Sequence, residues 1–184
     1  MKRNLKIILI LCLILTLSSC QRKDSQPDKQ TNNDTKTGSP SVSISYPIKI
    51  ETLNLNLMMD RKLEPIYDKY KATLDDEVLR GLAPIDILRI HNKAVEEWNV
   101  QVYVSLINLP AEVKKKDFEK EVMNDKISKK NEKILIEKYK KFTGKVTETT
   151  VSETEAYVEI ENDGFWRFEK TKSGIWKLGW LARQ

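Results

Sequence analysis

Asp86 and His91 are the two candidate proton-transfer residues of this sequence. His91 is the only histidine, and it falls among apolar residues at helical spacing, so it either fills the core or faces a cavity. Asp86 stands near the start of the same stretch, where a carboxylate acts as a general base or stabilises the first turn of a helix. We expect a structural histidine and a capping aspartate, with catalysis by either residue as the alternative.

The four tryptophans are the second set of candidate site residues. Trp98 follows the stretch that carries His91, and Trp166, Trp176 and Trp180 lie near the C-terminus. Large aromatic rings on a strand either fill a core or stack on a ligand. We expect the three C-terminal rings to belong to the core. The alternative is that all four tryptophans line a pocket together with His91.

Several classes of chemistry require residues or motifs that this sequence lacks. A single histidine excludes a histidine-cluster metal site, and Cys12 and Cys20 are the only cysteines. The sequence has no glycine-rich phosphate loop, no acidic metal-binding loop and no nucleophile elbow. We therefore expect no metal, no cofactor and no thiol catalysis in the folded part of the chain.

The positions of the candidate residues depend on a helix predicted from Pro84 to Trp98. Apolar residues and His91 recur there with a period near 3.6, which forms a single apolar stripe. Asn99 can end this helix and cap a second one that runs to about Ile107. These two helices would place His91 and Trp98 on neighbouring parts of one surface.

Residues 111–142 are helical in pattern but heavily charged. Phe118 and Val122 form one apolar pair, and a second apolar group begins at Leu135. The polar run Lys129–Asn131 lies between the two groups. The pattern therefore predicts two helices with a break at this run.

After Gly144 the apolar period changes to two, which is typical of strands. Tight turns at 162–164 and 173–174 are expected to join them in an antiparallel meander. The predicted strands are 147–151, 156–161, 165–170 and 175–182. Upstream, residues 48–57 predict a bulged strand or a packed extended segment, and residues 67–79 predict a short helix.

The first twenty residues predict export and lipid anchoring. Three basic residues precede an apolar run over residues 7–17, which is too short to span a bilayer as a free helix. The run ends in Leu17-Ser18-Ser19-Cys20, which resembles the bacterial lipobox. The resemblance implies that residues 1–19 are a signal peptide and that Cys20 becomes the lipidated first residue. An ordinary secretory signal or an uncleaved anchor is the alternative.

The amino-acid composition bears on the location of the protein and argues against nucleic acid as a partner. Residues 20–44 hold almost no apolar side chain, so the lipidated cysteine is expected to begin a flexible tether. Residues 1–19 contain three of the 32 basic residues and none of the 27 acidic ones. The remainder is close to neutral, and we expect no nucleic-acid binding. The predicted location is the extracytoplasmic face of a cell membrane. The high Lys, Asn and Ile content of the sequence suggests a Gram-positive bacterium.

Residues 45–184 are expected to form one domain, and four segments of it carry a family resemblance. They are Leu82–Leu88, Tyr103–Leu106, Phe165–Lys170 and Gly174–Leu178. Their order is similar to that of the NTF2-like superfamily, and more narrowly to small lipoprotein domains of the DUF4878 type. The resemblance implies an α+β cone with an apolar mouth, in which N-terminal helices pack on a curved, antiparallel, four-stranded C-terminal sheet. It implies no particular activity, since such folds carry enzymes, binding modules and scaffolds.

Three functions fit these features. The leading hypothesis is a non-enzymatic surface lipoprotein that binds an envelope protein, a wall component or a small apolar ligand. The second is a small-molecule isomerase or hydrolase that uses Asp86 or His91 inside the cone. The third is an assembly component of an envelope secretion or conjugation machine. A dead-end pocket with a carboxylate beside His91 would favour the enzyme, whereas a cone filled by tryptophan rings would count against it.

Overall fold

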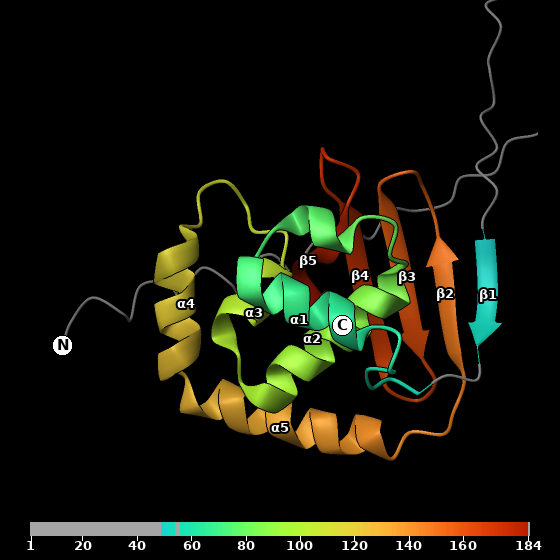
Figure 1. Cartoon of the computed structure of the whole chain (residues 1–184). Coiled ribbons are helices and arrows are strands. Elements are labelled where there is room, and N and C mark those ends of the chain that lie inside the picture. The colour runs from blue at the N-terminus through green and yellow to red at the C-terminus, as the bar shows by residue number, and fades with distance from the viewer. Residues whose placement is uncertain (1–48, 54–55, 184) are drawn as a thin grey trace, which may run out of the picture. The chain divides into compact units, whose positions relative to one another are not determined.

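The computed structural model of this chain describes residues 49–53 and 56–183. The predicted signal peptide, Cys20 and the predicted tether lie outside these residues. None of the described helices combines the length and the apolar character that a membrane span requires. The elements, labelled in Figure 1, follow in the order β1 (Lys49–Leu53), α1 (Glu64–Thr73), the 3-10 helix η1 (Asp76–Leu79), α2 (Pro84–Glu97), α3 (Val100–Ser105), α4 (Lys115–Asn124), α5 (Lys126–Lys140), β2 (Val146–Thr150), β3 (Glu155–Ile160), β4 (Gly164–Lys170) and β5 (Trp176–Arg183).

The strands form one antiparallel sheet in chain order, β1-β2-β3-β4-β5. The meander β2–β5 confirms the four predicted C-terminal strands, and cross-strand neighbours such as Val146 and Ile160 are buried together. The sheet has five strands and not the four that were predicted, because β1 pairs with β2 along its whole length. β1 lies within residues 48–57, where a bulged strand or a packed extended segment was predicted. Helices and an antiparallel sheet together make this an α+β protein.

Two tight turns join the last three strands. Asn162 and Gly164 have φ angles of 62° and 114° between β3 and β4, and Gly174 has a φ of 82° before β5. Such angles cost glycine little and asparagine less than most other residues. Asp163, inside the first turn, accepts a hydrogen bond of 2.9 Å from the hydroxyl of Tyr139 on α5. The turn is therefore tied to a helix as well as to its own strands.

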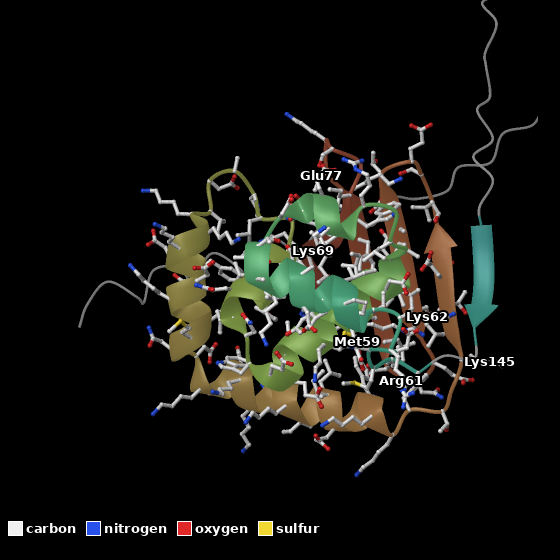
Figure 2. All side chains as sticks on the ribbon, in the orientation of Figure 1. Met59, Arg61, Lys62, Lys69, Glu77 and Lys145 are labelled. Atoms are coloured by element: carbon white, nitrogen blue, oxygen red, sulfur yellow. The ribbon has the colours of Figure 1, made fainter. Side chains whose placement is uncertain are left out.

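Helix α2 lies at the centre of the core and confirms the helix predicted at residues 84–98. Pro84 begins it, and the carboxylate of Asp86 accepts a hydrogen bond from the backbone of Ala83. Figure 1 shows α1, α2 and α3 in front of the sheet, and Figure 2 shows side chains filling the space between these layers. Each large apolar side chain buried there contributes roughly 1.5–3 kcal/mol. The apolar residues of α2 that are fully buried are Ile87, Leu88, Ile90, Ala94 and Val95.

Residues 56–60 form a strap that polar side chains hold against α2. The buried guanidinium of Arg89 donates to the backbone oxygen of Asn56 at 3.1 Å and lies 3.6 Å from the carboxylate of Asp60. The buried amide of Asn92 donates to the backbone oxygen of Leu57 at 2.8 Å. Buried polar groups need such partners, so the strap and α2 stabilise each other.

Two predicted helix boundaries are wrong. The helix expected at residues 67–79 is divided into α1 and η1, because Leu74 takes a left-handed conformation with φ of 52°. The break between the charged helices falls at Asp125 and not at Lys129–Asn131. Asp125 caps α5 by accepting hydrogen bonds from the backbone and the hydroxyl of Ser128, at 2.9 and 2.6 Å. The polar run is simply part of the first turns of α5.

Candidate functional site

His91 lies inside the protein. It is 2% exposed, its ring centroid lies 5.1 Å from that of Tyr103 and 5.3 Å from that of Trp166, and its Nδ1 lies 3.4 Å from Oδ1 of Asn92. Burial lowers the pKa of the imidazole to about 4, so the ring is neutral at pH 7. Among the described residues, no carboxylate forms a hydrogen bond or an ion pair with it.

Asp86 lies in the first turn of α2 and has two partners there. One carboxylate oxygen accepts from the backbone N–H of Ala83 at 3.4 Å, and the other lies 3.3 Å from the guanidinium of Arg89. Both contacts are those of a helix-capping, ion-paired residue. The structure does not bring Asp86 and His91 together, so these two residues form no acid–base pair.

The four tryptophans occupy three different environments. Trp166 is 5% exposed, and its indole N–H donates to the hydroxyl of Tyr139 at 2.9 Å. Trp176 is half-buried and packs against the edge of the core. Trp98 and Trp180 are also half-buried, and each lines a hollow beside α4. Trp98 and Trp180 are therefore the tryptophans that line these two surface hollows.

A groove of about 210 Å³ lies between the end of α2, helix α3 and the pair α4 and α5. In Figure 1, α4 stands beside α3 on the side away from β1, and α5 runs from its end. We call this hollow the aromatic groove, because three aromatic rings and three carboxylate side chains line it. Its lining residues are Trp98, Tyr103, Phe118, Glu121, Val122, Asp125, Ser128 and Glu132.

A second hollow of about 460 Å³, the outer hollow, continues along α4. It shares Phe118 and Glu121 with the aromatic groove, so the Phe118 ring forms part of the wall of both. The ring of Trp180 meets Phe118 edge-on, with 5.3 Å between centroids. Four aromatic rings therefore line one continuous strip of surface. The other residues of the outer hollow are Glu112, Val113, Lys114 and Asp117.

Trp98 has an unusual backbone conformation for a large residue. It ends α2 with φ of 53° and ψ of 41°, a left-handed conformation that favours glycine. A bulky residue there costs on the order of 1 kcal/mol. Leu74 ends α1 in the same conformation, but its side chain packs against the core. The indole of Trp98 lines the groove instead.

The groove has an acidic interior. Burial, and to a smaller extent the negative charge of Glu132, together raise the pKa of the Tyr103 phenol to about 12. One carboxylate oxygen of Glu132 is removed from solvent. The ammonium of Lys129 lies 4.9 Å from the centroid of the Trp98 ring, which is cation–π distance. A cation of the chain itself thus already contacts one of the groove rings.

These features suit an organic cation. Aromatic faces attract a positive charge that carries apolar groups, and carboxylates supply the opposite charge. The phenol of Tyr103 is protonated at neutral pH and can donate a hydrogen bond. In the part of the chain that the structure describes, no group of three His, Cys, Asp or Glu side chains is arranged to hold a metal ion.

Part of this groove follows from the sequence. Trp98 is one of the candidate pocket residues, although the pocket considered was one shared with His91, and Phe118 and Val122 form the apolar pair noted in the first charged segment. Trp180, which was expected in the core, lines the outer hollow. Glu132 is not singled out by any pattern, because its meeting with Tyr103 depends on how α5 folds back. The available signal is the narrow apolar face of α4, which is too small for a core helix.

Comparison with known proteins leaves the groove as the basis for assigning a function. The three aromatic rings of the groove come from different parts of the chain: Trp98 ends α2, Tyr103 lies in α3 and Phe118 lies in α4. No short sequence motif therefore encodes the groove. No protein-family model, no curated protein and no solved structure matches this chain.

Proposed function

We propose that this protein is a lipid-anchored lipoprotein of the extracytoplasmic membrane face, and that its domain is a non-enzymatic binding module. The aromatic groove is the observation that carries the binding role, because rings and carboxylates line an open space there. His91 is sealed in the core and Asp86 is paired with Arg89, which gives the enzymatic alternative no support. The anchor is supported by the lipobox resemblance that ends at Cys20.

The same proposal includes an NTF2-like fold. Its support is the order of elements, in which α1–α3 precede the meander β2–β5 and pack on it. Helices α4 and α5 are an addition to that plan. Tyr103 lies between His91 and the groove, since it contacts the imidazole and also lines the groove. We infer that the added helices replace a deep cone pocket by a shallower groove at its mouth.

The ligand class follows from the size and charge of the groove. A volume of about 210 Å³ is smaller than the ~300–1,000 Å³ typical of pockets for drug-sized ligands. It suits a small head group, such as a trimethylammonium group or an alkylamine. The source is either a free metabolite or a side chain of an envelope protein, because both present the same cation on an apolar carbon chain.

Calorimetric titration of the full-length protein with choline tests this function. We expect saturable binding, and a loss of about 10-fold in affinity for Phe118→Leu, which keeps apolar volume but removes a ring. Phe165→Leu is the matched control. Phe165 is also half-buried and makes a similar edge-on pair, with Tyr157 at 5.4 Å, but it lies outside the groove.

The control separates loss of the groove ring from general damage. Phe165→Leu should bind choline as the unchanged protein does, and urea unfolding should show that both variants are folded. Equal affinities for the two variants would show that choline does not bind in the groove. Absence of measurable binding to the unchanged protein would remove the proposed ligand class.

A further inference from the structure

The outer face of α5 exposes two large aliphatic side chains. Ile127 is 74% exposed and Ile134 is 60% exposed, although Leu135 and Tyr139 on the opposite face are buried in the core. The two isoleucines are seven residues apart, so they lie on one stripe of the helix. Single exposed apolar residues are ordinary. A stripe of them on a helix that is otherwise charged indicates a surface that contacts something apolar.

Lysines flank this stripe. Helix α5 contains six lysines and only two glutamates. In Figure 2, nitrogen-tipped side chains project from the outer side of α5, away from the sheet. Three of the lysines are engaged within the domain: Lys129 on the ring of Trp98, Lys138 with Asp163, and Lys140 with Glu96 and Glu137.

The other three lysines face outward together. Lys126, Lys130 and Lys133 make no ion pair with any described residue. They line a shallow hollow of about 500 Å³ together with Ile134, Lys129 and Glu137, and the carboxylate of Glu137 is paired with Lys140. Long lysine side chains can lay their methylene groups on apolar surface while the ammonium reaches outward. Positive charge and the aliphatic side chain of Ile134 therefore occur on the same face of α5.

This combination is typical of a helix that lies in a membrane interface. Such helices place aliphatic side chains at the boundary between headgroups and acyl chains, and their lysines contact anionic phosphates. Helix α5 has 15 residues, so it would lie along roughly 22 Å of bilayer surface. A nucleic acid would match the lysines but would leave Ile127 and Ile134 without an apolar partner.

We propose that the outer face of α5 rests on an anionic lipid surface. Ile127 and Ile134 enter the headgroup region, and Lys126, Lys130 and Lys133 contact lipid phosphates. The predicted tether would hold the domain within about 25–30 Å of the membrane, and this one step depends on the proposed anchor. The contact itself depends only on α5, and it is separate from ligand binding in the aromatic groove.

Fluorescence at a single labelled cysteine tests this contact. The full-length chain with Cys12→Ala and Cys20→Ala receives either Ile134→Cys or, as a control, Lys172→Cys in the exposed turn before β5. An environment-sensitive fluorophore at each position is measured with phosphatidylglycerol vesicles and with phosphatidylcholine vesicles. We expect a blue shift at position 134 on the anionic vesicles only, and no shift at position 172.

The lysines are tested in the same labelled chain. Lys126→Ala, Lys130→Ala and Lys133→Ala together should abolish the blue shift at position 134. A matched set, Lys62→Ala, Lys69→Ala and Lys145→Ala, removes three exposed lysines on other segments, which are labelled in Figure 2, and should leave the shift unchanged.

Three results would overturn the proposal. The first is equal emission at position 134 on both kinds of vesicle, and the second is a blue shift that survives loss of the three α5 lysines. The third is a concentration-dependent shift without vesicles, which would show that a second copy of the chain covers this face. Cys20 is replaced and choline is absent in this experiment, so failure of the anchor or of the groove would not produce any of these results.

Discussion

At the scale of single residues, a chain of contacts connects the groove to the opposite end of the core. Tyr103 lines the groove, and its ring contacts the ring of His91, which in turn contacts the ring of Trp166. The indole N–H of Trp166 donates to the hydroxyl of Tyr139, which in turn donates to Asp163. The polar groups of Trp166, Tyr139 and Asp163 are therefore hydrogen-bonded to one another, which lowers the free-energy cost of burying them. His91 thus has a structural explanation that needs no catalysis.

The buried His91 should make stability depend on pH. Its pKa is lowered from 6.5 to about 4 by burial, so between these pH values the unfolded chain binds more protons than the folded chain. The stability is therefore full above pH 6.5, and about 3 kcal/mol of it should be lost as the pH falls to 4. Asn92, Tyr103 and Trp166, which contact the ring, do not titrate in this range.

Urea unfolding between pH 4 and 7 measures this effect against His91→Gln. The variant lacks the titrating group, so its free energy of unfolding should fall less steeply than that of the unchanged protein. The carboxylates that also titrate in this range are common to both proteins. Parallel pH profiles would show that His91 is accessible to protons in the folded state, which contradicts its sealed position.

At the scale of elements, the corner between α4 and α5 forms the groove. Asp125 closes this corner on both sides. Its backbone N–H donates to the backbone oxygen of Glu121 at 3.0 Å, and its side chain caps α5 through Ile127 and Ser128. Because Glu121, Asp125 and Ser128 all line the groove, the angle between the two helices and the width of the groove are set together.

Removing the cap should weaken both the fold and the groove. Asp125→Ala is expected to cost about 1 kcal/mol in urea unfolding, because two backbone N–H groups at the start of α5 lose their acceptor. Asp125→Asn keeps an acceptor oxygen and should cost less than half as much. If the two substitutions cost the same, the charge of Asp125 and not its capping hydrogen bonds would hold the corner.

Local patterns account for the elements that were predicted, and distant contacts account for the rest. The meander has a clear period of two with turns at Gly164 and Gly174, and α2 has a clear period of 3.6. The end of α4 is harder to predict from the sequence, because the polar run Lys129–Asn131 resembles a break between helices but lies within α5. The sequence signal for the break is Asp125 itself, because aspartate is a favoured residue at the N-cap of a helix.

Two sets of contacts could not be predicted from local patterns: those that hold residues 56–60 against α2, and the meeting of Tyr103 with Glu132 in the groove. Arg89 and Asn92 lie on the helix that carries the core stripe, yet their partners are backbone oxygens more than thirty residues earlier. In the same way, Tyr103 and Glu132 meet only because α4 and α5 fold back beside α3. Both features depend on tertiary contacts, which periodicity does not encode.

At the scale of the whole molecule, the proposed functions use different surfaces. The aromatic groove opens between α3, α4 and α5, whereas the lysine-flanked stripe lies on the outer face of α5. Ser128 and Glu132 line the groove, and Lys126, Lys130 and Lys133 line the hollow beside the stripe. Helix α5 would therefore contact the membrane with one face and line the ligand-binding groove with another, which would place the groove near the lipid surface.

Lipid attachment at Cys20 is the prediction that concerns the chain as a whole. Cells that express the unchanged protein and are grown with radiolabelled palmitate should yield a labelled chain, and Cys20→Ala should take up no label. Cys12→Ala is the control, because residue 12 lies within the predicted signal peptide and should not be the acylated position. Label that persists in Cys20→Ala would place acylation elsewhere or exclude the lipobox assignment.

Recognition of a positive charge on an apolar group is the proposed function of the aromatic groove. Its most direct test is a comparison of choline with 3,3-dimethylbutan-1-ol, which has the same shape but carries no charge, by calorimetric titration of the full-length protein. Cation–π attraction and the groove carboxylates predict that choline binds more tightly, by on the order of 10-fold. Equal affinities, or tighter binding of the neutral alcohol, would contradict the claim and leave a purely apolar groove.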